Sequence, residues 1–299
     1  SKLEVLKGPF ATGPDVTKAC LTCHTEAGEQ IRQTTHWTWL YEHDETGQTL
    51  GKSKVINSFC GMTITNEPRC TSCHVGYGWN DMREPPPQAE NAVDCLVCHD
   101  TTGEYWKFPT LAGHPTYIPR EWPKGSGKMV QPPDLERIAR NVGASGRANC
   151  GSCHFHGGGA DGVKHGDLDT SLINPPKSLD VHMSPEGLNF GCSDCHTTMG
   201  HAVSGSRYQA NARDTLGIDV PGHTDFSRAS CESCHGLAPH DKPKLNDHVD
   251  KLACQTCHIP EFAKGGVATK TVWDWSTAGK LMDGKPYSEE EFVQSDGKH

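Results

Sequence analysis

The segment Cys95-Leu-Val-Cys-His99 decides how this chain is built. Its pattern is two cysteines separated by two residues and followed directly by a histidine, and it occurs seven times in 299 residues. With 15 cysteines and 18 histidines in the chain, chance alone predicts only about 0.04 copies. The repeat is therefore not accidental, and any account of the fold has to begin from it.

This pattern is the attachment signature of c-type haem. The two thiols add to the two vinyl groups of the porphyrin, and the adjacent histidine becomes an axial ligand of the iron. A zinc site does not need a histidine after every cysteine pair, and a disulfide needs none. We therefore predict seven haems c in this chain. The attachment residues are Cys20, Cys23 and His24; Cys70, Cys73 and His74; Cys95, Cys98 and His99; Cys150, Cys153 and His154; Cys192, Cys195 and His196; Cys231, Cys234 and His235; and Cys254, Cys257 and His258.

The composition also calls for a core that side chains do not supply. Hydrophobic residues make up only 34% of the chain and aromatic residues 7%, while 32 glycines and 20 prolines favour turns and coil. Seven apolar haems would supply the hydrophobic core that the side chains lack. The formal net charge of −9 argues against nucleic acid as a partner. No apolar run has the length that a membrane span needs.

Haem attachment to cysteines takes place outside the cytoplasm, so we expect a periplasmic or extracellular protein. No signal peptide is visible, which places Ser1 near a processed start. The motifs recur about once per 43 residues, a density that brings neighbouring haems close enough for rapid electron transfer. Redox donors, either quinol-linked proteins or small cytochromes, are the expected protein partners.

We predict a fold of mostly α-helix and coil with little β structure, a multihaem cytochrome c wrapped around a closely packed haem array. Residues 1–299 are expected to form one domain. The clearest helix has Asp134 as its N-cap and ends at Gly143. Its apolar stripe consists of Leu135, Ile138, Ala139 and Val142.

Weaker signals complete the prediction of local structure. A helix is expected over Asn246–His258, and Ser288 with Glu291 resembles a capping box. The best strand candidate is Thr271–Ser276. Residues 84–91 are predicted to be a stiff connector and residues 109–133, rich in proline and glycine, a long loop.

Eleven histidines lie outside the motifs, and they are candidates for the second axial position. A haem that only carries electrons usually has both axial positions filled, often by two histidines. Seven irons each need a sixth ligand, so we expect most of these histidines to be distal ligands, with a solvated or hydrogen-bonded ring as the alternative for any one of them. They are His36, His43, His114, His156, His165, His182, His201, His223, His240, His248 and His299.

The segments between the motifs resemble octahaem tetrathionate reductase, a family of periplasmic multihaem c-type cytochromes. The resemblance extends over residues 8–279. The matching segments are Gly8-Pro-Phe-Ala-Thr-Gly-Pro14, Thr34-Thr-His-Trp-Thr-Trp39, Ile56-Asn-Ser-Phe-Cys60, Asn66-Glu-Pro-Arg-Cys-Thr-Ser-Cys-His74, Asp94-Cys-Leu-Val-Cys-His-Asp-Thr-Thr-Gly103, Cys150-Gly-Ser-Cys-His-Phe-His-Gly-Gly-Gly159, Val163-Lys-His-Gly-Asp-Leu-Asp169 and Trp273-Asp-Trp-Ser-Thr-Ala-Gly279.

The resemblance implies one active haem with a lysine as its distal ligand, the second haem along the chain, which here is held by Cys70, Cys73 and His74. It also implies a catalytic set of four residues. By the spacing of the family's pattern these are Asn57, Cys60, Asp161 and Lys164, with Lys164 as the iron ligand. Without the resemblance, Cys60 is equally a small buried side chain, and Asp161 and Lys164 belong to a solvated turn.

Lysine ligation has a cost that bears on function. A free lysine amine has a pKa near 10.4, so holding it neutral at pH 7 costs about 4.6 kcal/mol. The bond to iron must exceed that cost, and a nearby aspartate favours the ammonium form and so promotes release. A displaceable ligand suits entry of a small anionic substrate.

The family has eight haem motifs and this chain shows seven. We therefore expect a C-terminal segment with an eighth haem beyond residue 299. The histidine count agrees, because eight haems with one lysine ligand need seven distal histidines, whereas seven haems need six. Seven spare histidines lie in family-like contexts: His36, His165, His182, His201, His223, His240 and His248.

Two functions of different classes fit the sequence. The first is a reductase that cleaves tetrathionate to thiosulfate, or reduces nitrite or hydroxylamine, at a lysine-ligated haem fed by bis-histidine haems. Cys60 then either attacks sulfur as a thiolate or shapes the pocket. The alternative is a non-catalytic electron conduit, polymerised as a homo-oligomer into an extracellular filament, which has no need for the set around Lys164.

Overall fold

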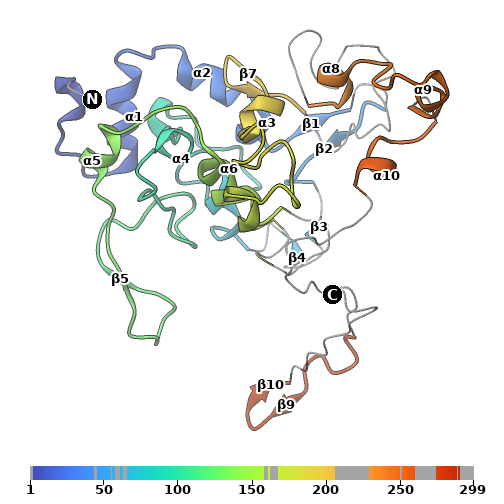
Figure 1. Cartoon of the computed structure of the whole chain (residues 1–299). Coiled ribbons are helices and arrows are strands. Elements are labelled where there is room, and N and C mark those ends of the chain that lie inside the picture. Colours follow the sequence, from blue (N-terminus) through green and yellow to red (C-terminus); the bar gives the residue numbers. More distant parts are fainter. Residues whose placement is uncertain are drawn as a thin grey trace.

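The computed structural model describes residues 3–43, 46–54, 56–57, 61–62, 66–157, 161, 168–205, 229–249, 251–259, 274–287 and 289, with backbone alone for 56–57, 61–62 and 286. The α-helices of this part of the chain are all short (Figure 1). They are α1 (Gly13–Leu21), α2 (Ala27–Arg32), α3 (Thr35–Thr38), α4 (Leu96–His99), α5 (Leu135–Ala139), α6 (Arg147–His154), α7 (Cys192–Cys195), α8 (Glu232–His235), α9 (Pro243–Val249) and α10 (Gln255–His258). The 3-10 helices are η1 (Glu4–Leu6), η3 (Cys70–Cys73), η4 (Glu90–Ala92) and η5 (Thr170–Ile173).

The strands are two residues long and pair only as antiparallel hairpins in the described residues. The pairs are β1 (Tyr41–Glu42) with β2 (Thr49–Leu50), β3 (Ile56–Asn57) with β4 (Gly61–Met62), β5 (Arg120–Glu121) with β6 (Met129–Val130), β7 (Thr198–Met199) with β8 (Ala202–Val203), and β9 (Leu281–Met282) with β10 (Lys285–Pro286). The predicted class, mostly helix and coil with little β structure, is confirmed.

The largest side-chain core forms where α1, α4 and α5 meet η1 (Figure 1). A capping box starts α1, because the Thr12 hydroxyl accepts from the Asp15 amide at 3.4 Å and the Asp15 carboxylate accepts from the Thr12 amide at 2.8 Å. The buried residues of this core are Leu6, Val16, Leu96, Leu135, Ile138 and Ala139. Two smaller clusters are Trp37 with Ala92 and Val93, and Trp39 with Trp79 and Met82.

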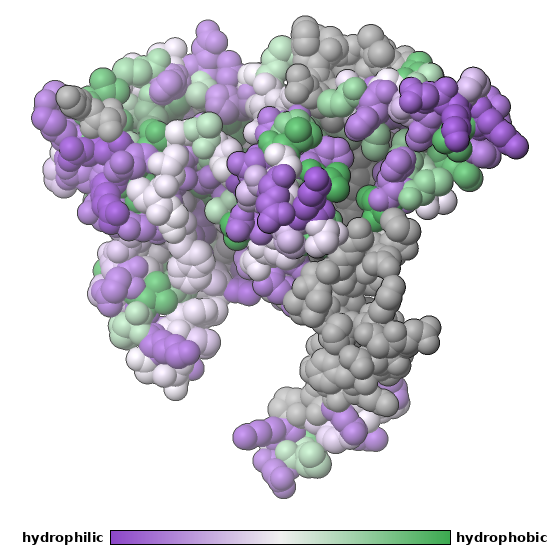
Figure 2. Space-filling model, in the orientation of Figure 1, coloured by the Kyte–Doolittle hydropathy of each residue, from purple (hydrophilic) through white to green (hydrophobic). Residues whose placement is uncertain are grey.

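In the described residues the hydrophobic core is confined to the first half of the chain. Every buried hydrophobic residue of the described part lies between Leu6 and Phe155. From residue 168 onward the buried residues are Pro175, Ser184, Ser204 and Glu232. Hydrophobic residues such as Leu188 and Val181 are more than half exposed there, and Figure 2 shows green residues scattered in small patches rather than gathered in one. Side chains alone therefore do not explain how this second half packs.

The predicted helix after Asp134 exists but is shorter than expected. The Asp134 carboxylate accepts from the Arg137 amide at 3.0 Å, which confirms the N-cap. The helix ends with Arg140 as C-cap rather than at Gly143, because the Asn141 amide turns to the Ile138 carbonyl at 2.9 Å. Val142 consequently leaves the apolar stripe and is 41% exposed, so its placement in the core was wrong.

Three other expectations need correction. The helix predicted over Asn246–His258 is two helices, α9 and α10, with residues 251–254 outside both. The described residues of the predicted strand Thr271–Ser276, from Asp274 onward, form no strand. The predicted loop 109–133 contains the β5–β6 hairpin, which projects as an arm in Figure 1. Ser288 and Glu291 lie outside the described residues. None of the helices that the structure describes has the length and apolarity to cross a membrane.

Truncation of Ile138 tests the α1–α4–α5 core. Ile138 is fully buried, so Ile138→Ala should lower the free energy of unfolding by about 2–5 kcal/mol through lost burial and the cavity left behind. Val142→Ala on the same segment is the matched control and should change stability little, because Val142 is exposed. Urea unfolding followed by far-ultraviolet circular dichroism gives both values. Equal losses would mean that α5 is not part of the core.

Candidate haem sites

Six of the seven motifs wind into one α-helical turn. The histidine amide donates to the carbonyl of the first cysteine, four residues back, at 3.0 Å for His24, 3.1 Å for His99, 2.8 Å for His196, 2.9 Å for His235 and 3.0 Å for His258. The motif at Cys150 lies within α6. Residues three and four apart share one face of a helix, so both thiols and the imidazole of each motif lie on one side, as attachment to one haem requires.

The motif at Cys70 is different. It forms the 3-10 helix η3, and the His74 amide donates to Thr71 rather than to Cys70, at 3.0 Å. His74 is 1% exposed, whereas most other motif histidines are exposed. Its ring packs against the rings of Trp37, Trp39 and Trp79, with centroid distances of 4.7, 5.7 and 4.9 Å.

Three of the histidines outside the motifs each face a motif histidine, and the distance between the two ring centroids is nearly the same in all three pairs. Ring centroids are 6.2 Å apart for His36 and His154, 6.1 Å for His182 and His235, and 6.1 Å for His240 and His258. An imidazole binds a metal ion through a bond of about 2 Å, so two rings on opposite sides of one iron have centres roughly 6 Å apart. The residues present thus fit bis-histidine haem irons at the motifs that end in His154, His235 and His258.

Hydrogen bonds fix the orientation of other rings. The Nδ1 atoms of His99 and His196 lie 2.8 and 2.9 Å from the carbonyls of Gly143 and Ser204. Because a carbonyl only accepts, each Nδ1 carries the proton and each Nε2 is left as a metal ligand. This is the second hydrogen bond that metal-binding histidines commonly make.

His201 shows the same feature at the tip of the β7–β8 hairpin. Its φ of 67° is rare for a residue with a side chain, and such strain is often found at functional sites. Its Nδ1 lies 2.8 Å from Oε1 of Gln30 on α2. Burial lowers the pKa of His201, with smaller effects from His99 and His24. The ring therefore lies near two motif histidines, and the structure does not separate them as partners.

Arg147 holds the segment that carries His182. Its guanidinium donates from α6 to the carbonyls of Ile173 at 3.0 Å, Phe190 at 2.6 Å and Met183. One planar group with several donors suits such a fork. The segment lacks a hydrophobic core of its own, so these bonds, together with the Asp180 carboxylate that accepts from the His182 amide at 2.8 Å, hold His182 opposite His235.

Cysteines of different motifs touch in pairs. The Cys153 thiol is the main reason that the pKa of Cys73 is lowered to about 6, and the Cys150 thiol does the same for Cys192. Cys20 likewise has its pKa lowered chiefly by Cys95. These pKa values belong to free thiols, and the contacts show which motifs adjoin one another.

The contacts show which motifs are neighbours. Motif one (Cys20) touches three (Cys95), two (Cys73) touches four (Cys153), and four (Cys150) touches five (Cys192). The Cys231 and Cys254 thiols also touch, which joins motif six to motif seven. Cys234 acts on Cys195 and Cys98 acts on Cys150 only through a weak charge effect, so motifs five and six, and motifs three and four, are near each other without a thiol contact. Motif two adjoins motif four through Cys73 and motif three through the Asp94 amide, which donates to the Val75 carbonyl at 2.9 Å.

The predicted catalytic set is only partly described. Asn57 lies in β3 opposite Gly61, while Cys60 and Lys164 lie outside the described residues. Asp161 is exposed, and its carboxylate accepts from the Thr170 hydroxyl at 2.5 Å and the Thr170 amide at 3.0 Å, which lowers its pKa. Of the predicted distal ligands, His165 and His223 are not described, and His248 is exposed on α9.

Comparison with known proteins identifies the chain. A family model described as cytochrome c554 and c-prime matches residues 19–100. A crystal structure of an octahaem cytochrome c from Shewanella oneidensis matches 99% of this chain at 46% sequence identity with a TM-score of 0.72. The chain is a multihaem c-type cytochrome. It spans 59% of the length of the Shewanella protein, with which it is homologous. No curated protein sequence matched it.

The predicted relationship of the cytochrome to the octahaem proteins is confirmed, and so is its use of haem c. The individual ligands, the number of haems and the extent of the domain stay predictions.

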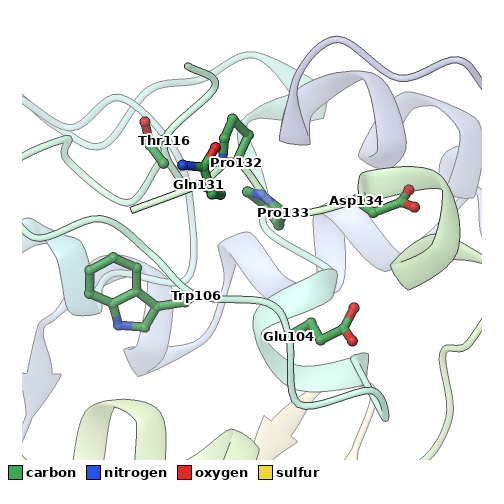
Figure 3. A pocket seen from close by; sticks show the side chains of 7 residues that line it. All are labelled: Glu104, Trp106, Thr116, Gln131, Pro132, Pro133 and Asp134. Atoms are coloured by element: carbon green, nitrogen blue, oxygen red, sulfur yellow. The ribbon is translucent and has the colours of Figure 1, made fainter. Parts of the chain in front are cut away.

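A surface pocket of about 240 Å³ has none of the predicted catalytic residues among those that line it (Figure 3). Glu104 and Asp134 line it, and both are already engaged: Glu104 pairs with Arg137 at 2.6 Å, and Asp134 caps α5. Two carboxylates disfavour an anionic substrate, so this pocket is no candidate for the active site of the cytochrome.

Sequence reasoning missed several residues around the motifs. Trp37, Trp39 and Trp79 surround His74, and Gln30 orients His201. A buried ion pair of Lys107 with Asp94 was not predicted either. The only sequence signal was the presence of Trp37, Trp39 and Asp94 within the segments that resemble the family.

Removal of His36 tests the pairing with His154. In His36→Ala one iron should lose a strong ligand, so the cytochrome should gain one high-spin haem that binds cyanide readily, while the total haem content stays the same. His156→Ala is the matched control, since His156 is exposed and lies beside the same motif. Electron paramagnetic resonance and cyanide titration make the comparison. Spectra that match the unaltered protein would exclude His36 as a ligand.

Proposed function

We propose that the cytochrome is a reductase whose active haem is held by Cys70, Cys73 and His74, with Lys164 as the displaceable sixth ligand and tetrathionate as the substrate. Nitrite and hydroxylamine are the other candidate substrates. The observation that carries the proposal is the environment of His74. Its ring contacts in the described part of the chain are all with tryptophans, including Nε2 at 2.7 Å from the Trp37 carbonyl, whereas His154, His235 and His258 each face another histidine.

The pattern of cysteine contacts supports the same assignment. Motif two touches motif four through Cys73 and Cys153, and in the described residues no thiol contact links it to any further motif. The Cys153 thiol also lies 3.8 Å from the carbonyl of Cys73. A haem whose motif has a single thiol contact does not help an electron-transfer chain to pass electrons from one end to the other. Such a position suits a terminal site at which electrons are consumed.

The side chains near motif two suit a small anion. Lys52 lies with its Nζ 4.5 Å from the centre of the Trp39 ring, and Trp39 packs on His74. A cation beside the site raises the local concentration of anions. The hydrogen bonds from Thr170 lower the pKa of Asp161, so this carboxylate is ionised at neutral pH and favours the ammonium form of Lys164 when that amine leaves the iron.

The proposed reaction is the two-electron cleavage of one S–S bond. Tetrathionate takes up two electrons, its central S–S bond breaks, and two thiosulfates leave with no proton consumed. Bound haems supply one-electron transfer. Cys60 either attacks sulfur as a thiolate or shapes the pocket, and Asn57 is proposed to orient the substrate.

The remaining haems are proposed to be bis-histidine carriers. Their distal ligands are proposed from His36, His165, His182, His201, His223, His240 and His248, and seven haems c are proposed for this chain, with an eighth expected in the family. c-type cytochromes are extracytoplasmic, and we propose a periplasmic or extracellular location, with quinol-linked proteins or small cytochromes as electron donors.

A non-catalytic conduit remains the second candidate, and one observation favours it. Neighbouring motifs follow one another from motif one to motif seven, as a path for electrons through the chain requires, and such a path can continue into a second copy in a filament. Electron microscopy of the purified cytochrome separates filaments from single particles.

Replacement of Lys164 separates reductase from conduit. Lys164→His should give the active haem a ligand that substrate does not displace, so turnover of tetrathionate, nitrite or hydroxylamine should fall by orders of magnitude. Electron transfer among the other haems should persist, because their ligands are unchanged. Lys128→His, at an exposed lysine of the β5–β6 arm, is the control. Activity is measured with a reduced dye as donor alongside the haem spectrum. Unchanged turnover at full haem content would place the chemistry elsewhere.

A further inference from the structure

We propose that the buried ion pair of Lys107 and Asp94 sets the redox potential of the haem attached at Cys70, Cys73 and His74, independently of its distal ligand. The inference rests on the proposed binding of haem at that motif. It does not depend on which substrate is reduced or on whether Lys164 is the sixth ligand.

The pair joins two motifs in the interior. Nζ of Lys107 lies 3.1 Å from Oδ2 of Asp94, with the two side chains 7% and 0% exposed. Nζ also donates to the backbone carbonyl of His74, the proposed iron ligand of motif two. Asp94 directly precedes Cys95 of motif three, and its amide donates to the carbonyl of Val75 at 2.9 Å. The ion pair therefore lies between the two motifs.

The carboxylate is satisfied on both oxygens. Oδ1 accepts from the Tyr77 hydroxyl at 2.8 Å and the Val97 amide at 3.1 Å, and Oδ2 accepts from the Tyr105 hydroxyl at 2.9 Å. Burial raises the pKa of both tyrosines, with Asp94 adding to the effect, so both hydroxyls stay protonated as donors. Such a network holds its charges in fixed positions.

Stability is a poor explanation for this arrangement. Removing two charges from water costs several kcal/mol per ion, and replacing a buried pair with apolar residues is often neutral or stabilising. A buried charge near an iron has a different consequence, because a fixed cation stabilises the reduced, less positive iron and a fixed anion stabilises the oxidised one.

The two charges lie against different motifs. Nζ of Lys107 donates to the carbonyl of His74 in motif two. Asp94 directly precedes Cys95 of motif three, and its Oδ1 accepts from the amide of Val97 inside that motif.

Variants of the pair test the proposal by the sign of the shift. Lys107→Gln keeps a donor but removes the cation, so the midpoint potential of the motif-two haem should move to a more negative value. Asp94→Asn removes the anion and should move it to a more positive value. The double variant should lie between the two, and Lys128→Gln, the same change at an exposed lysine, should leave it unchanged.

The potential is read by spectroelectrochemical titration of the holoprotein, in the absence of substrate. The signal of the motif-two haem is assigned as the one lost in Cys70→Ala/Cys73→Ala. Shifts of the same sign in both single variants would show a structural role only and overturn the proposal, as would shifts no larger than that of Lys128→Gln.

A milder variant keeps the test decisive if Lys107→Gln fails to fold. Tyr105→Phe removes one hydroxyl donor from Asp94 and leaves the formal charges unchanged. The less stabilised carboxylate should then make the potential more negative, by less than in Lys107→Gln, and an unchanged potential would overturn the proposal. Loss of turnover in Lys164→His is measured separately, so failure of the proposed reductase activity and failure of this inference are distinguishable.

Discussion

One hydrogen bond organises the repeated unit of this cytochrome: the amide of each motif histidine donates to the carbonyl of the first motif cysteine in the turns at Cys20, Cys95, Cys192, Cys231 and Cys254. It closes one helical turn and sets two thiols and an imidazole on one side. Covalent attachment then makes each haem part of the local chain. The only described motif without this bond, at Cys70, forms a 3-10 turn, and its histidine packs among three tryptophans.

The two halves of the chain differ in how many side chains they bury, and this difference explains how each half is held together. The first half has a core around Ile138 and Leu96, and the second half has none in the described residues. Contacts in the second half are instead between motifs and between ring pairs such as His182 with His235. The haems we propose there take the place of a core, and the short helices mainly carry their ligands. In this proposal electron transfer and folding depend on the same contacts.

The motifs could be predicted from the sequence because they are local: five adjacent residues contain all the information. The partner of each iron is not local. His36 and His154 lie 118 residues apart, and nothing in the sequence around His36 points to motif four rather than another. The burial of Lys107 could not be predicted for a related reason. Lysine is almost always exposed, and its burial here depends on Asp94, Tyr77 and Tyr105 together. Val142 was misplaced because apolar periodicity does not reveal that the helix ends at Arg140.

The central claim is that paired rings and touching cysteines mark where the irons lie and which of them are neighbours. Crystallography of the holoprotein with anomalous scattering at the iron edge tests it most directly. The account predicts seven irons, with one between His36 and His154, one between His182 and His235, and one between His240 and His258. It also predicts that the iron of His74 has the iron of His154 as its nearest neighbour. An iron at His154 with a ligand other than His36, or an iron of His74 nearest to any other motif, would contradict the account.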